Sequence, residues 1–332
     1  MKNILLVIAF VFTLLQANAQ TADYIIRNGK LIDGTGNQWQ YKDVAIKGNQ
    51  IIAIGNLKNW KATREIDAKG LIVAPGFIDV HGHLEGGEFR NPLASNFLYD
   101  GVTTVVTGNC GGSAENLNTY FNTLDSIGMS INIASLIGHN TIRKQVMGTA
   151  NRHATEAEMQ QMEKIAVQAM QDGAVGMSTG LIYIPGTYAP TEEIVRLAKV
   201  IASKGGVYAS HIRNEENQVV DAVNEAIQIG RAANIPVEIS HFKISGQNNW
   251  GRSKETIPLV INARKEGIDV TIDQYPYTAS STQLSVLLPD WVLSDGQDSI
   301  FARLKNPTIR KKVANEIIGI LKERGIKHFT YA

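Results

Sequence analysis

Four histidines and one cysteine are the residues of this chain whose types and spacing best suit a metal ion: His81, His83, Cys110, His211 and His241. Neutral imidazole and thiolate are both preferred ligands of zinc. His81 and His83 lie two residues apart, so on a strand their side chains point the same way and could reach one ion. Cys110 would add the negative charge that four imidazoles lack, and the glycines around it would let the backbone approach a metal closely.

The segments that must position these residues alternate between short apolar runs and helical stretches, which is typical of a parallel sheet with crossover helices. The sequence predicts seven strands, at residues 71–80, 102–107, 131–137, 173–178, 206–210, 236–240 and 268–275. It predicts helices at residues 155–172, 191–204, 217–233 and 307–324, the second with Thr191 as its N-cap. The candidate ligands follow strands one, two, five and six, and a (β/α)-barrel gathers the carboxyl ends of its strands at one face.

The predicted fold class is therefore α/β, a (β/α)8-type (TIM) barrel with a small β-sandwich domain before it. Residues 20–70 are expected to form the N-terminal part of that β domain, because Asn28-Gly29 and Gly48-Asn49 separate short apolar runs. Residues 71–282 are expected to supply barrel strands one to seven. Only one helical stretch follows, so we expect that the eighth strand is missing, that residues 283–332 begin an insertion between strands seven and eight, and that the chain is truncated.

The first 19 residues have the layout of a signal peptide. Lys2 precedes an apolar run at residues 4–15, and Ala17-Asn18-Ala19 forms a small-residue cleavage site. We expect export to the periplasm or the extracellular space after cleavage near Ala19; the alternative is an uncleaved anchor. The 32 basic and 31 acidic residues nearly cancel, which argues against nucleic acid or a membrane surface as partner and favours a small-molecule substrate.

Several phrases of the chain, between about residues 24 and 291, together resemble the D-aminoacylase (N-acyl-D-amino-acid deacylase) family of the amidohydrolase superfamily. They are Gly76-Phe77-Ile78-Asp79-Val80-His81-Gly82-His83, Gly108-Asn109-Cys110-Gly111, Gly176-Met177-Ser178-Thr179-Gly180-Leu181-Ile182-Tyr183, Ser210-His211-Ile212-Arg213-Asn214-Glu215, Ser240-His241-Phe242-Lys243 and Tyr275-Pro276-Tyr277. The resemblance implies zinc-dependent hydrolysis of the linear amide of N-acyl-D-amino acids.

The resemblance also implies roles for individual residues. Cys110, His211 and His241 would hold a tight Zn2+, and His81 and His83 would contribute to a second, weaker site. The substrate would be bound by four further residues, Tyr183, Lys243, Tyr275 and Ser281, of which Tyr183 would line the pocket for the amino-acid side chain. The general base would be an Asp on strand eight, beyond Ala332. Ser294-Asp295-Gly296 looks like its phrase, but it follows strand seven too soon for a helical crossover.

Three other interpretations remain open. Gly176-Met177-Ser178-Thr179-Gly180 fits the nucleophile elbow of serine hydrolases, although Pro185, Gly186 and Pro190 follow where that motif needs a helix. A second interpretation is another amidohydrolase, either a cyclic-amide hydrolase or a β-aspartyl dipeptidase. The third is an inactive zinc-binding fragment that lacks the strand-eight Asp.

Overall fold

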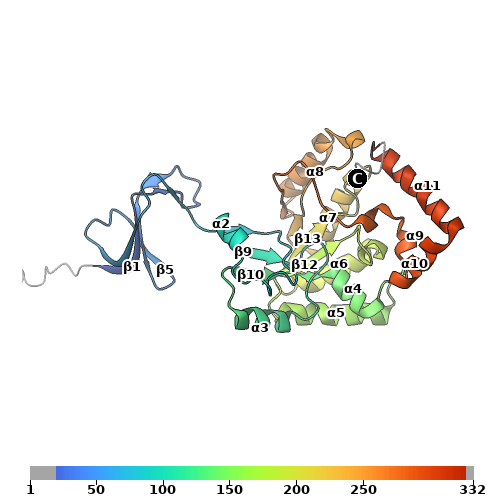
Figure 1. The fold of residues 1–332 in the computed structure, drawn as a ribbon, viewed down its shortest axis with the longest axis horizontal. Helices are drawn as coiled ribbons and strands as arrows, with labels where there is room; N and C mark the ends of the chain where they lie inside the picture. Colours follow the sequence, from blue (N-terminus) through green and yellow to red (C-terminus); the bar gives the residue numbers. More distant parts are fainter. Residues whose placement is uncertain (1–19, 327–332) are drawn as a thin grey trace, which may run out of the picture. The chain divides into compact units, whose positions relative to one another are not determined.

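A computed structural model describes residues 20–326, and their contacts divide the chain after Gly76 into two compact units (Figure 1). The predicted signal peptide, residues 1–19, lies outside the described residues. Within residues 20–326, no helix has the length and apolar character needed to cross a membrane.

The first unit consists of two small sheets. One has the order β5-β4-β1-β6 and the other the order β3-β2-β7. Their strands are β1 (Thr21–Arg27), β2 (Lys30–Leu31), β3 (Gln40–Tyr41), β4 (Asp43–Lys47), β5 (Gln50–Gly55), β6 (Lys61–Asp67) and β7 (Ile72–Val73). The turn at Gly48-Asn49 joins the antiparallel pair β4 and β5, as predicted. The turn at Asn28-Gly29 does not form a hairpin, because β1 and β2 belong to different sheets.

The strand predicted at residues 71–80 is two short strands in two different units. β7 pairs with β2 in the first unit, and β8 (Phe77–Asp79) pairs with β9 (Val102–Thr107) in the second. Pro75 lies between them and has no N–H to continue a ladder. The contacts therefore divide the chain after Gly76, whereas the predicted boundary at Gly70 marks where the sequence pattern changes to alternating strands and helices.

The second unit contains the parallel strands. They are β8, β9, β10 (Asn132–Ser135), β11 (Ile137–Gly138), β12 (Gly176–Gly180), β13 (Val207–His211), β14 (Val237–Ile239) and β15 (Val270–Ile272). They form sheets β10-β9-β8 and β11-β12-β13-β14-β15, and only Leu136 separates β10 from β11. The seven predicted strand positions are thus all occupied in chain order, and residues 20–326 show no eighth strand in this series.

Helices alternate with these strands and cover them (Figure 1). They are α2 (Ser95–Tyr99), α3 (Leu117–Ile127), α4 (His139–Met147), α5 (Glu156–Gln171), α6 (Thr191–Ala202), α7 (Val219–Ala233), α8 (Ser253–Lys265), α9 (Asp290–Leu293), α10 (Gln297–Lys305) and α11 (Pro307–Glu323). The four predicted helices correspond to α5, α6, α7 and α11, with small differences at their ends. Three short 3-10 turns, Gly186–Tyr188, Gln247–Asn249 and Leu284–Leu287, lie in the loops.

Helix α6 shows why these segments form helices. The buried apolar side chains of this helix recur at helical spacing; they are Ile194, Leu197, Ala198 and Ile201. The acidic residues of its first turn interact favourably with the positive, N-terminal end of the helix dipole. Burying each large aliphatic side chain stabilises the fold by about 1.5–3 kcal/mol. The N-cap residue is Pro190 and not Thr191, which is the first residue of the helix. The Thr191 hydroxyl donates to Glu225 of α7 at 2.8 Å.

Candidate metal centre

The loop after β9 places Cys110 at the carboxyl ends of the strands. Gly108 and Gly111 have φ angles of 76° and 79°, which favour glycine. A Cβ atom on Gly108 would lie 2.1 Å from the backbone oxygen of Leu136, and one on Gly111 would lie 2.6 Å from the backbone nitrogen of Gly180. The glycines therefore let this loop pack against the neighbouring strand ends, which in turn brings the Cys110 sulfur to the centre.

Three donor atoms from three strand ends converge on one point. The Nδ1 atom of His211 lies 2.8 Å from Nε2 of His241, and the Cys110 Sγ atom lies 3.6 Å from that Nε2. His81 adds its Nε2 atom at 3.4 Å from Cys110 Sγ. Lone pairs this close repel one another unless a proton or a cation lies between them. This donor set of imidazole and sulfur fits Zn2+.

The five candidate ligands form two overlapping groups that share the cysteine. His81, His83 and Cys110 form one group, and Cys110, His211 and His241 form the other, with the donor atoms of each group within 4.8 Å of one another. β8 ends at Asp79, one residue before the predicted end of this strand, so His81 and His83 both lie in the loop that follows it. His83 is the most exposed of the four histidines, with 54% of its side-chain surface accessible.

Burial has opposite consequences for the two kinds of donor at the centre, because it disfavours the thiolate of Cys110 but keeps the imidazole of His211 neutral. It raises the pKa of the Cys110 thiol to about 12, with smaller contributions in the same direction from Glu215 and Asp273. Burial also lowers the pKa of His211 to about 3, so this imidazole is neutral at physiological pH and can donate a lone pair. A bound cation would reverse the shift at the cysteine, because it stabilises the thiolate directly.

Two carboxylates contact the Nδ1 atoms of the His81 and His241 imidazoles, on the side of each ring away from the Nε2 atom that faces Cys110. The sequence analysis did not select either of them. Asp273 follows β15, and its Oδ2 atom lies 2.9 Å from Nδ1 of His81. Its Oδ1 atom accepts the backbone N–H of His241 at 2.6 Å. The strand predicted at residues 268–275 included Asp273, so the rule that functional residues follow strand ends did not select it; the observed strand ends one residue before Asp273, at Ile272.

Glu215 is the second of these carboxylates and lies in the loop after β13. Its Oε1 atom is 2.9 Å from Nδ1 of His241 and accepts from Nζ of Lys243 at 2.6 Å. Burial alone would raise the pKa of Glu215, but the bond from His241 and the charges of His211, Lys243 and His241 lower it to about 2. Glu215 is therefore a carboxylate at neutral pH, and it directs the lone pair of His241 Nε2 toward Cys110 and His211.

We expect Glu215→Gln to weaken metal binding by about 10–100-fold, the usual cost of losing a carboxylate behind a metal-binding histidine. The amide still fills the space but cannot fix the tautomer of His241 as firmly. Competition with a zinc-binding dye measures the affinity directly. The matched control is Glu216→Gln, since Glu216 is next in the chain but pairs with Arg324 away from the centre. Equal affinity for both variants would contradict this role for Glu215.

The four predicted substrate residues lie beside these donors. Tyr183, Lys243, Tyr275 and Ser281 all line one cavity of about 550 Å3, together with Cys110, His211 and His241. Lys243 Nζ also lies 5.6 Å from the centre of the Tyr275 ring. Tyr183 packs on His211 with ring centroids 4.9 Å apart. The structure thus brings together residues that lie far apart in the sequence.

Ser178 and Asp295, which the sequence analysis considered and argued against, are not among the residues that line either cavity at the metal donors. Ser178 is fully buried, and its hydroxyl donates to the backbone oxygen of Gly108 and accepts from the N–H of Gly111. This serine therefore fixes the Cys110 loop, and no helix follows it directly, which argues against the nucleophile elbow. The Asp295 carboxylate forms an ion pair with Arg303 at 2.7 Å. The general base predicted beyond Ala332 lies outside the described residues and stays a prediction.

The family model that matches this chain is described as "Amidohydrolase family" and covers residues 64–326. The chain belongs to the amidohydrolase family. Its sequence is 39% identical to D-aminoacylase of Alcaligenes xylosoxydans xylosoxydans over 292 residues, which cover 81% of this chain and 60% of that protein. The chain thus spans about three fifths of the length of this relative.

Solved structures of amidohydrolases agree with this membership. A crystal structure of D-aminoacylase superposes with a TM-score of 0.76 at 38% identity, over 80% of this chain and 62% of the other. The structure of N-acyl-D-glutamate deacylase from Bordetella bronchiseptica, complexed with zinc and a phosphonate inhibitor, superposes with a TM-score of 0.75 at 38% identity. The match covers 78% of this chain and 59% of the other. The relatives are thus metal-dependent deacylases, and D-aminoacylase is described with a binuclear metal centre.

Proposed function

We propose that this amidohydrolase hydrolyses the linear amide of N-acyl-D-amino acids and uses Zn2+ to do so. The observation that carries the proposal is the convergence of Cys110, His211 and His241 beside a cavity that contains Lys243. The same chemistry is named in its relatives, D-aminoacylase and N-acyl-D-glutamate deacylase. Zinc bound at such a centre supplies Lewis acidity, which activates water and polarises an amide carbonyl.

We assign the tighter metal position to Cys110, His211 and His241. The thiolate offers the only anionic ligand of the two groups, and His211 is the most buried of the histidines in them. The group of His81, His83 and Cys110 would form the weaker position, because it must share the sulfur and includes the more exposed His83. Asp273 and Glu215 would keep the Nε2 atoms of His81 and His241 directed at the metal.

Lys243 would bind the carboxylate of the substrate. Its Nζ atom donates to Glu215 at 2.6 Å and to the backbone oxygen of His241 at 3.4 Å. An ammonium group has three donors, so one remains for a further acceptor. Tyr275 and Ser281 line the same cavity and would add hydroxyl groups to the carboxylate site. Tyr183 is part of the wall of the cavity, where it would contact the side chain of the D-amino acid.

We expect the zinc-loaded protein to release free amino acid from N-acetyl-D-amino acids and to leave N-acetyl-L-amino acids and dihydropyrimidines intact. A chiral chromatographic assay for the released amino acid measures this result. The metal-free protein, with zinc restored afterwards, is the control for a contaminating enzyme. Turnover of a dihydropyrimidine instead of the linear amide would show that the proposed substrate class is wrong.

A further inference from the structure

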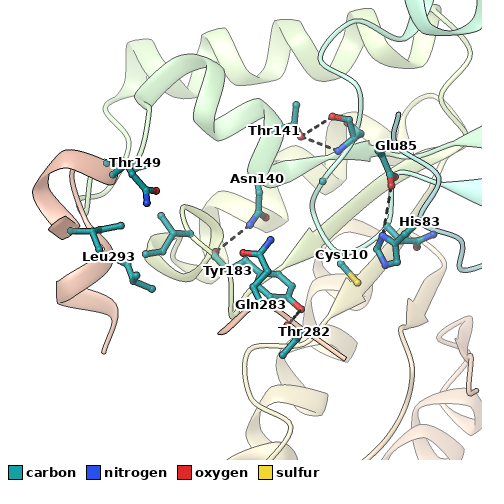
Figure 2. A pocket seen from close by; sticks show the side chains of 17 residues that line it. His83, Glu85, Cys110, Asn140, Thr141, Thr149, Tyr183, Thr282, Gln283 and Leu293 are labelled. Carbon is teal, nitrogen blue, oxygen red and sulfur yellow. Dashed lines mark hydrogen bonds and ion pairs between the residues drawn. The ribbon is translucent and has the colours of Figure 1, made fainter. Parts of the chain in front are cut away.

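A second cavity, larger than the one that contains Lys243, opens from the same metal donors. Its volume is about 780 Å3, and it shares His83 and Cys110 with the smaller cavity (Figure 2). Tyr183 and Thr282 also line both cavities, and their hydroxyl groups lie 3.0 Å apart. The two cavities therefore meet at the metal centre, with the Tyr183–Thr282 pair at their common wall.

A linear amide needs space on both sides of the bond that is cleaved. If its carbonyl lies at the metal donors, the amino-acid half and the acyl half must extend in different directions. Among the described residues that line either cavity, Lys243 is the only Lys or Arg, and it belongs to the smaller cavity. The smaller cavity is thus the one that suits a free carboxylate, which leaves the larger cavity for the other half of the molecule.

The lining of the larger cavity indicates what that half would be. Near the metal donors, Glu85 is the one carboxylate, and it accepts from Thr107 Oγ1 at 2.6 Å and from the N–H of Gly108 at 2.8 Å. Most of the other polar residues are neutral amides and hydroxyls. Figure 2 shows Leu293 at the end away from His83 and Cys110. Ile300 of α10 and Ile184 add further apolar surface.

The size of the cavity is large for a short acyl group. Pockets of about 300–1,000 Å3 commonly hold whole drug-sized ligands, whereas an acetyl group contributes only two carbons and one oxygen. A chain that reaches Leu293 could bury several methylene groups. A chain with a terminal carboxylate would find no Lys or Arg among the described residues of this lining.

We propose that the larger cavity is the acyl site and that it takes neutral acyl chains substantially longer than acetyl. This inference rests on the proposed deacylase function and adds the class of acyl group to it. Selectivity would come from apolar contact with Leu293 and Ile300, together with the absence of Lys and Arg among the described residues of the lining.

The test uses calorimetry with the zinc-loaded full chain, because binding can then be measured without turnover. The probes are three phosphonate analogues of an N-acyl-D-amino acid, with a methyl, a hexyl or a carboxypentyl group in the acyl position. We expect the hexyl analogue to bind at least about tenfold more tightly than the methyl analogue, since each fully buried methylene contributes about 0.8 kcal/mol. The carboxypentyl analogue should bind at least about tenfold more weakly than the hexyl one.

Ile300→Asp tests the position of the chain and should remove most of the hexyl-to-methyl preference. Phe301→Asp is the matched control, since Phe301 is adjacent on α10, half exposed and absent from the lining of either cavity. If Ile300→Asp does not fold, Leu293→Ala serves the same purpose. Equal binding of the methyl and hexyl analogues would overturn the acyl site and leave the deacylase function intact. Failure of all three to bind would overturn both proposals.

Discussion

Replacement of Cys110 by alanine is expected to reduce the zinc content of the purified protein from about one equivalent to less than about a tenth. The sulfur is common to both groups of candidate ligands, and it is the only donor among them that becomes an anion on binding. Without it, His211 and His241 would offer only two neutral nitrogens to the tighter position. Elemental analysis after dialysis against a weak chelator measures the loss, and hydrolysis of N-acetyl-D-amino acids should fall with it.

The control for this experiment is Ser203→Ala, which removes a single hydroxyl from an exposed residue just after α6. It should retain zinc in full. Circular dichroism of the Cys110→Ala protein would show whether its helices are still formed. Full zinc retention by a folded Cys110→Ala protein would refute the assigned ligands.

Replacement of Glu193 by glutamine is expected to lower the free energy of unfolding by about 3–5 kcal/mol, the usual cost of leaving a buried charge unpaired. Glu193 lies on α6 and is almost completely buried. Its carboxylate accepts two bonds from Nη1 of Arg143, at 2.9 and 2.7 Å, and lies 2.9 Å from Nε2 of His139. Urea unfolding followed by circular dichroism measures the change.

Glu192→Gln is the matched control, because it makes the same change at the neighbouring, exposed position of α6. It should change stability by less than about 0.5 kcal/mol. The double variant Arg143→Met with Glu193→Leu should be less destabilised than Glu193→Gln alone, since neither charge then remains. If Glu193→Gln lowers the free energy of unfolding by less than about 1 kcal/mol, the contacts of Glu193 with Arg143 and His139 do not stabilise the fold as proposed.

The effect of Glu193 should also depend on pH. Burial alone would raise its pKa, but the bonds and charges of His139 and Arg143 lower the pKa below its ordinary value. A carboxylate with a lowered pKa contributes stability above the pKa of the unfolded chain and loses that contribution as the pH falls through the folded value. The stability difference between the native protein and Glu193→Gln should therefore be largest near neutral pH and should shrink in acid.

Much of the architecture can be predicted from the sequence alone, because strands and helices have characteristic local patterns of apolar residues. The seven strand positions follow from apolar runs and turn residues, and the histidines stand out because they follow those runs. The sequence could not show that residues 71–80 form two strands in two units, because that depends on which strand each half of the segment pairs with. β7 pairs with β2, and β8 pairs with β9.

For the centre itself, sequence determined the types and order of the donors, since His81, Cys110, His211 and His241 each follow a predicted strand. Only the tertiary structure decided how they are held. Asp273 reaches His81 across 192 positions of the chain, and Glu215 reaches His241 from a different loop. Contacts of this kind depend on strand register and loop path, which no local periodicity encodes. The same holds for the two cavities, whose shapes arise where side chains from separate loops meet.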